Sequence, residues 1–152
     1  MQILVDADSC PRQVRDLIIR TSERTKINAL FAANRPIPGI EGKTIFMEIC
    51  PPGEGSADRR IIALAAPGDL VITRDIPLAE KLVEARILVL DDRGRVYTPE
   101  NIRQYRSIRD YTVGLAENGL GIERIPNYGK KELKTFADSL DRELTRLLKK
   151  PL

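Results

Sequence analysis

The sequence predicts an α/β fold, a three-layer sandwich with a mostly parallel central sheet and additional C-terminal helices. Four short runs, around Ile3, Leu30, Leu70 and Ile87, are apolar throughout, as is typical of strands that are buried on both faces of a sheet. Segments with helical periodicity separate these runs, which is the chain order of a parallel sheet covered by helices. The length of 152 residues, of which 42% are hydrophobic, suits one compact domain over 1–152.

The first half of the chain alternates strand and helix patterns. An apolar run at 2–5 precedes an amphipathic helix over 12–24, where Pro11 suits the first helical position and Ser9 or Cys10 the cap before it. Strands are expected at 27–33 and 43–49. A break rich in Pro and Gly at 51–55 then leads into a helix over 56–66.

The second half begins with further strands and becomes helical. The expected elements are a strand at 70–73, a helix over 76–85, a strand at 87–90, a small strand at 95–97, and helices over 99–117 and 130–149. One apolar face of the last helix comprises Leu133, Phe136, Ala137, Leu140, Leu144 and Leu147. There is no internal repeat and no low-complexity segment.

The composition excludes several kinds of chemistry. The chain has no His, so triads that use His and zinc sites that contain His are ruled out. Two Cys cannot build a disulfide framework or a structural zinc site, and a net charge of +3 does not by itself indicate a nucleic-acid binder. There is no signal-peptide pattern and no apolar stretch of about 20 residues, so we expect a cytoplasmic protein without a membrane partner.

Acidic residues gather where the predicted strands end. Asp6 and Asp8 follow the first strand, Asp75 follows the strand at 70–73, and Asp58 opens the helix after the Gly-rich break. Ligand sites in open α/β sheets lie beyond the carboxyl ends of the strands, so the four carboxylates are expected on one rim. Two carboxylates about 4 Å apart repel by about 4 kcal/mol at an effective dielectric of 20. We therefore expect a Mg²⁺ or Mn²⁺ site here, with these four residues as metal ligands and catalytic groups.

Helix capping is the competing interpretation of these aspartates. Asp8 and Asp75 each precede a predicted helix, and Asp58 lies in a first helical turn, where the dipole favours an anion. For any one residue, capping is the commoner role. It leaves Asp6 unexplained, because that residue ends an apolar strand.

The chain resembles the bacterial YaiI/YqxD family (UPF0178, DUF188). The resemblance covers nearly the whole chain and is carried by VDADSCP at 5–11, Ala57-Asp58, GDLVITRDIPLA at 68–79, Arg93-Gly94, Tyr97-Thr98, Asn101-Ile102 and Arg109. The family is similar to the PIN-domain nucleases, which implies a PIN-like fold and metal-binding roles for Asp6, Asp58 and Asp75, with Asp8 as an added carboxylate. The acidic residue that PIN domains carry after the second strand has no clear equivalent, because 32–42 holds only Glu41. Whether Asp8 replaces it is left open.

Arginines flank the predicted site. Arg12, Arg59, Arg60 and Arg74 each lie near a site aspartate in sequence, and they either pair with the carboxylates or bind phosphate beside a metal. On the predicted helix over 99–117, Arg109 is a further candidate nucleic-acid contact. Together with Arg103 and Arg106 it more commonly marks a solvated face.

The remaining polar candidates favour structural roles. Asp69, Asp91 and Asp92 lie in sequences typical of turns, although the last two follow a strand and could join the rim. The Cys10 thiol, at a helix start, is expected to be buried rather than activated, and Cys50 to be structural.

These observations predict a metal-dependent phosphodiester hydrolase, ribonuclease-like, that acts on RNA or another nucleic acid. A water molecule polarised by the ion is the expected nucleophile, with Ser9 and Thr73 supporting the carboxylates by hydrogen bonds. The alternative is a non-catalytic RNA- or protein-binding PIN-like module whose Asp cluster pairs with Arg12, Arg59 and Arg74. A weaker third hypothesis is a phosphatase-like or nucleotide-hydrolysing enzyme that uses the same acidic site. The sequence leaves the oligomeric state open, and the strand at 95–97 either extends the sheet or pairs with another chain.

Overall fold

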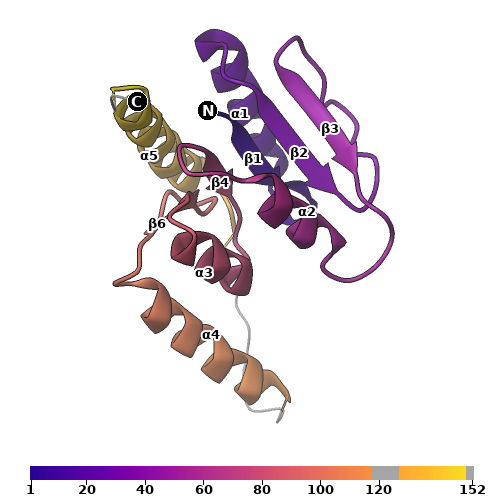
Figure 1. The fold of residues 1–152 in the computed structure, drawn as a ribbon. Coiled ribbons are helices and arrows are strands. Elements are labelled where there is room, and N and C mark those ends of the chain that lie inside the picture. The colour runs from indigo at the N-terminus through magenta and orange to yellow at the C-terminus, as the bar shows by residue number, and fades with distance from the viewer. Residues whose placement is uncertain (118–126, 150–152) are drawn as a thin grey trace.

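The computed structural model describes residues 1–117 and 127–149 and confirms the α/β fold (Figure 1). A six-stranded sheet has the order β3-β2-β1-β4-β5-β6, in which β1 to β5 are parallel and β6 is antiparallel to β5. The strands are β1 (Ile3–Asp6), β2 (Ala29–Ala33), β3 (Ile45–Ile49), β4 (Leu70–Ile72), β5 (Leu88–Leu90) and β6 (Val96–Tyr97). The small strand β6 therefore extends the sheet.

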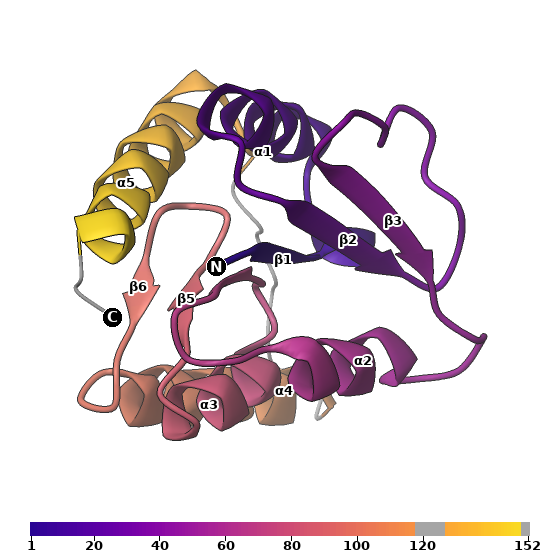
Figure 2. The same ribbon diagram turned by 45° about the horizontal axis from the view of Figure 1, so that its top comes forward.

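Helices cover both faces of this sheet (Figure 2). They are α1 (Arg12–Thr25), α2 (Ser56–Leu64), α3 (Ile76–Glu84), α4 (Ile102–Glu117) and α5 (Lys130–Lys149), and a single 3-10 turn, η1 (Ala7–Ser9), follows β1. On one face α1 and α5 pack against Ile3, Val5 and Phe31. On the other face α2, α3 and the start of α4 pack against Leu4 and Val71. Adjacent strand residues thus enter different cores, as their uninterrupted apolar pattern predicts.

Several boundaries differ from the sequence prediction for local reasons. Pro11 is the N-cap of α1 rather than its first residue, and no side chain caps that helix. Helix α4 begins at Ile102, later than predicted, because Thr98 and Asn101 form a reciprocal turn: the Thr98 N–H donates to Asn101 Oδ1 at 2.8 Å and the Asn101 N–H to Thr98 Oγ1 at 3.1 Å. The predicted helix over 130–149 is confirmed at both ends, and its Phe136, Leu140 and Leu144 are buried.

The strand order reverses between β1 and β4. From β1 the chain proceeds to β2 and β3 on one side, and β4 then pairs with the other side of β1 and leads to β5. The two connections leave the sheet in opposite directions, so a crevice opens beyond the carboxyl ends of β1 and β4. Asp6 ends the first of these strands, and Thr73, Arg74 and Asp75 follow the second.

None of the helices within the described residues combines the length and the apolar character needed to cross a bilayer.

Candidate functional site

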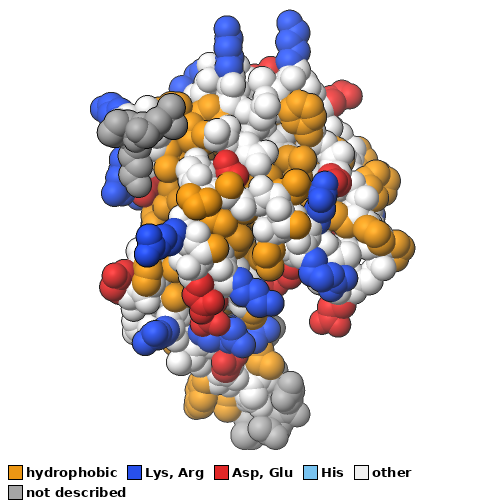
Figure 3. All heavy atoms as spheres, viewed as in Figure 1, with side chains coloured by type: hydrophobic (Ala, Val, Ile, Leu, Met, Phe, Trp, Pro, Cys, Tyr) orange, Lys and Arg blue, Asp and Glu red, His pale blue; other side chains and the backbone are white. Residues whose placement is uncertain are grey.

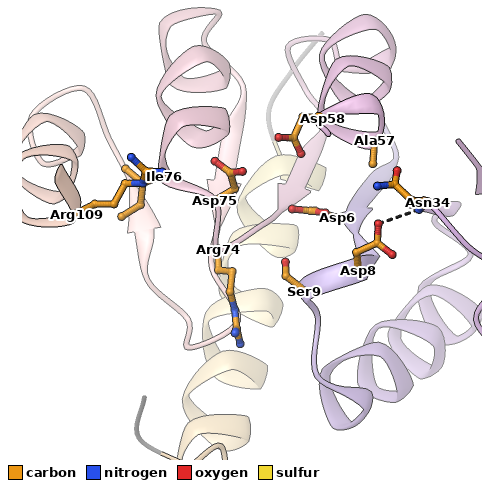
Figure 4. A pocket seen from close by; sticks show the side chains of 11 residues that line it. Asp6, Asp8, Ser9, Asn34, Ala57, Asp58, Arg74, Asp75, Ile76 and Arg109 are labelled. Atoms are coloured by element: carbon orange, nitrogen blue, oxygen red, sulfur yellow. Dashed lines mark hydrogen bonds between the residues drawn. The ribbon is translucent and has the colours of Figure 1, made fainter. Parts of the chain in front are cut away.

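A pocket of about 390 Å³ lies in the crevice between β1 and β4 (Figure 4). It brings together all four predicted acidic residues, which come from β1, η1, α2 and the loop that follows β4. Its lining residues are Asp6, Asp8, Ser9, Asn34, Gly55, Ala57, Asp58, Arg74, Asp75, Ile76 and Arg109. The carboxylates of Asp6, Asp58 and Asp75 are turned towards a common space in Figure 4.

Asp6 is the most buried of these acids. The residue is 8% exposed, and its Oδ2 accepts a hydrogen bond of 2.9 Å from the Thr73 hydroxyl on the neighbouring strand end. Burial raises the pKa of Asp6, and the negative charges of Asp75 and Asp8 raise it further, whereas hydrogen bonds from Thr73 and Ser9 lower it. Thr73 and Ser9, the two residues predicted to support the carboxylates, thus both lie beside Asp6.

Asp58 and Asp75 form an interacting acidic pair, because the Asp75 side chain acts on the pKa of Asp58 both through its charge and through a side-chain hydrogen bond. Burial, then the charges of Asp75 and Asp6, raise the pKa of Asp58 to about 6, and Lys81 opposes this only weakly. Asp75 is also the N-cap of α3, since its Oδ1 accepts the Leu78 N–H at 3.0 Å. Asp75 therefore both caps α3 and lines the acidic pocket.

Asp8 does not cap α1, contrary to the capping interpretation. Its Oδ2 instead accepts the backbone N–H of Asn34 at 2.8 Å and so ties η1 to the loop after β2. The Asn34 Oδ1 in turn accepts the Ser56 hydroxyl at 2.7 Å, at the start of α2. These contacts fix one wall of the pocket across three separate segments of the chain.

The arginines do not neutralise the acidic pocket. Among the described residues, no Lys or Arg forms an ion pair with any of the four carboxylates. Arg12 pairs with Asp16, Arg60 with Glu48 and Arg74 with Asp92, and Arg59 donates to the Glu54 carbonyl. The pairing assumed in the non-catalytic alternative is therefore wrong.

Of the five arginines predicted to contact nucleic acid, Arg74 and Arg109 line the pocket. The Arg74 side chain runs along the wall away from the three facing carboxylates in Figure 4, and Asp92 Oδ2 accepts its Nε at 3.0 Å. Arg109 reaches the pocket from α4, next to Ile76, and pairs with Asp110 at 3.2 Å. Arg12, Arg59 and Arg60 are not among the lining residues.

A divalent ion requires oxygen ligands that converge on one point. No group of three or more Cys, Asp or Glu side chains within residues 1–117 and 127–149 is arranged so that it could hold a metal ion. Mg²⁺, however, commonly binds through one or two carboxylates and keeps several of its waters. The adjacent Asp58 and Asp75, which share a pocket with two further carboxylates and form no ion pair there, have the chemistry for such binding.

The turn residues have the expected structural roles. Asp69 accepts the N–H groups of Ala66 and Gln2 at the opposite end of the sheet, and Asp91 accepts those of Arg93 and Arg95 within its turn.

Neither cysteine takes part in the pocket. Cys10 and Cys50 are buried free thiols, and burial raises the pKa of Cys10 to about 12, the opposite of the shift that activates a thiol.

Comparison with known proteins places the chain in a family. The family model described as "Uncharacterized BCR, YaiI/YqxD family" (DUF188) matches residues 4–146. The chain belongs to the YaiI/YqxD family. It is 48% identical to a UPF0178 protein of Treponema pallidum over 98% of this chain and 84% of that protein. It is 43% identical to one of Treponema denticola (98% and 95%) and 42% identical to one of Myxococcus xanthus (98% and 97%). No solved structure matches.

Two features of this YaiI/YqxD protein's pocket are missing from the sequence prediction. Asn34 directly follows β2, so the rule that located Asp6 and Asp75 at strand ends would have found it too. The strand-end rule allows Asp92 at the rim, but the sequence does not indicate that it pairs with Arg74, because the pair depends on the β5–β6 turn approaching the end of β4.

Proposed function

We propose that this YaiI/YqxD protein is a Mg²⁺- or Mn²⁺-dependent phosphodiester hydrolase that acts on RNA or another nucleic acid at the acidic pocket. The observation that carries the proposal is the set of four carboxylates that open into one pocket without an ion pair to Arg or Lys among the described residues. Such a cluster is costly to keep ionised, and a divalent cation removes that cost.

Asp58 and Asp75 would hold the ion, because their side chains interact with each other in the pocket. Asp6 and Asp8 contribute negative charge to the same pocket. A bound divalent ion supplies stabilisation of the charge that develops on a phosphoryl oxygen and increases the acidity of water.

The rest of the pocket supports substrate binding. Arg109 and Arg74 line its wall, and a guanidinium matches a phosphate by paired hydrogen bonds. Asp92 restrains Arg74, which limits the side-chain entropy lost when an anion binds. Thr73 holds Asp6 in place through its hydroxyl. Burial raises the pKa of Asp6 above its ordinary value.

The test is cleavage of a fluorescently labelled single-stranded RNA by purified protein, with Mn²⁺ or with a chelator. Wild type should cleave only with the ion, and Asp75→Asn should lose about 100-fold or more of the rate. Asn is a good helix N-cap, so this substitution removes the charge and keeps the cap of α3. Asp16→Asn, on the exposed surface of α1, is the matched control and should retain the rate.

Cleavage that persists in Asp75→Asn and in Asp58→Asn would contradict the proposal, because it would come from a contaminant or from another site. A phosphomonoester tested in parallel separates a nuclease from a phosphatase-like enzyme.

A further inference from the structure

The strand β3 forms one edge of the sheet and has an unpaired outer side. In the parallel ladder with β2, the Ala29 N–H donates to the Thr44 C=O and the Cys50 N–H to the Ala33 C=O. Backbone groups of a parallel strand alternate between its two sides, so the even-numbered residues face β2 and the odd-numbered ones face outward. The N–H groups of Met47 and Ile49 have no hydrogen-bond partner among the described residues.

This edge also carries exposed apolar side chains. Phe46 is 48% exposed and Ile49 is 54% exposed, on a strand of five residues. Figure 3 shows hydrophobic side chains along the side of the molecule where β3 runs in Figure 1. The strand contains no Pro, and its charged residue, Glu48, is engaged with Arg60 at 2.8 Å. Proline and unpaired charged side chains usually protect a sheet edge from pairing with another chain, and β3 has neither.

Among the described residues, the β2–β3 connection pairs with only the first residue of this edge. Its Ile37 and Ile40 pack with the core on the α1 face. Its one backbone hydrogen bond to the outer side of β3, among the described residues, runs from the Ile45 N–H to the Gly42 C=O at 3.3 Å.

We infer that β3 pairs antiparallel with β3 of a second copy of this chain, about a two-fold axis at Met47. In that register the two Met47 residues exchange both backbone hydrogen bonds, and each Ile49 N–H donates to the Ile45 C=O of the other copy. These are outward-facing groups, so the β2–β3 ladder stays intact.

The side chains are self-complementary in the same register. Phe46 of each copy lies opposite Glu48 of the other, beside the hollow of about 410 Å³ that Glu48, Ile49 and Arg60 help to line. There the ring meets the Arg60 guanidinium, a favourable partner for an aromatic face. On the opposite face of the sheet, Ile49 meets Ile45 and Met47 meets Met47, so each exposed apolar side chain of β3 gains an apolar or cationic neighbour.

The experiment measures molar mass by light scattering during size exclusion and Kd by sedimentation, up to about 100 μM of full-length protein. Wild type should be dimeric at the upper end of this range. Ile49→Glu and Phe46→Glu should each weaken the dimer by about tenfold or more, since each places a carboxylate in the apolar contact or opposite Glu48. Ile108→Glu is the matched control, because Ile108 on α4 is also 54% exposed and lies away from β3. It should leave the Kd unchanged.

A backbone variant tests the register independently of side chains. Met47→Pro removes an outward N–H without touching the bonds to β2, so the monomer should keep its circular dichroism spectrum and lose the dimer. Wild type that is monomeric throughout, or a dimer that tolerates both Glu substitutions on β3, would overturn the inference. In the first case the edge is free for an extended peptide of another protein.

Discussion

The Thr73 hydroxyl lies between the two strand ends of the acidic pocket: it donates to Asp6 Oδ2 at 2.9 Å and accepts the Asp75 N–H at 3.0 Å. One side chain thus orients a buried carboxylate and fixes the backbone of a second acidic residue. This hydroxyl has no substitute nearby in β4, because the residues before it, Leu70–Ile72, are apolar.

Thr73→Val keeps the shape of the side chain and removes the hydroxyl. We expect a loss of about 1–3 kcal/mol in the free energy of unfolding, because Asp6 and the Asp75 N–H each lose a partner. The pKa of Asp6 should rise further, since a hydrogen bond that lowers it is gone. Urea unfolding measures the first effect, and Thr73→Ser, which retains the hydroxyl, should recover most of it. A Val variant as stable as wild type would show that the contact contributes little.

Asp58→Asn should stabilise the metal-free protein at neutral pH. The pKa of Asp58 is about 6 in the folded protein and near 3.8 in an unfolded chain, so the folded state binds more protons between these values. Stability of the wild type therefore falls as pH rises through this window, and it stays lower above it. We expect a gain of about 1 kcal/mol at pH 7, allowing for solvent screening of a half-buried group.

Thermal unfolding at several pH values checks this expectation. The difference between variant and wild type should shrink as pH falls and vanish at about pH 3, below both pKa values, where the carboxyl is largely protonated in both states. A difference that does not depend on pH would point to a cause other than charge.

Divalent-ion binding should weaken as pH falls through about 6, because protons compete with the ion for Asp58. Titration calorimetry with Mn²⁺ at pH 7.5 and at pH 5.5 is expected to give a tighter Kd at the higher pH. Asp58→Asn should bind more weakly and lose most of this pH dependence. Equal Kd values for the wild type at both pH values would remove Asp58 from the binding group.

The ion pair between Arg74 and Asp92 should couple the pocket wall to the β5–β6 turn. Arg74→Met leaves the Asp92 side chain, which is 7% exposed, without its charged partner and should cost about 2 kcal/mol. In a double-mutant cycle, Arg74→Met combined with Asp92→Asn should cost less than the sum of the single changes by about 1 kcal/mol. Additive effects in urea unfolding would mean that the pair is energetically unimportant.

Gly94→Ala should be strongly destabilising. A Cβ at this position would lie 2.7 Å from both the Ser139 Oγ and the Thr135 carbonyl oxygen on α5, and the backbone φ is +84°. Gly39 has a similar φ of +87° with nothing within 4 Å of its Cβ position, so Gly39→Ala isolates the backbone cost of about 1–2 kcal/mol. Chemical denaturation should show a clearly larger loss for Gly94→Ala, and similar losses would show that α5 shifts to accommodate the methyl group.

The fold was predictable because local pattern and global layout agree. The apolar runs around Ile3 and Leu70 admit few arrangements other than strands covered on both sides, and that arrangement directs attention to Asp6 and Asp75. The hydrophobic pattern of the sequence does not indicate which long charged side chains pair across distant segments of the chain. Arg74 is adjacent to Asp75 in sequence, yet its partner is Asp92, and local charge balance gives no hint of this choice. The pattern also places the start of α4 too early, because the turn between Thr98 and Asn101 delays the first helical residue.

The position of β1 and β4 at the centre of the sheet has a consequence for motion. Both strands have neighbours on each side and are buried on each face, so their amide hydrogens should exchange with solvent only when the whole domain unfolds. Asp6 and Thr73 stand at the ends of these two strands and are hydrogen-bonded to each other. The acidic floor of the pocket should therefore be as rigid as the domain core, and adaptation to a ligand is left to the surrounding walls, Asn34 on its loop and Arg109 on α4.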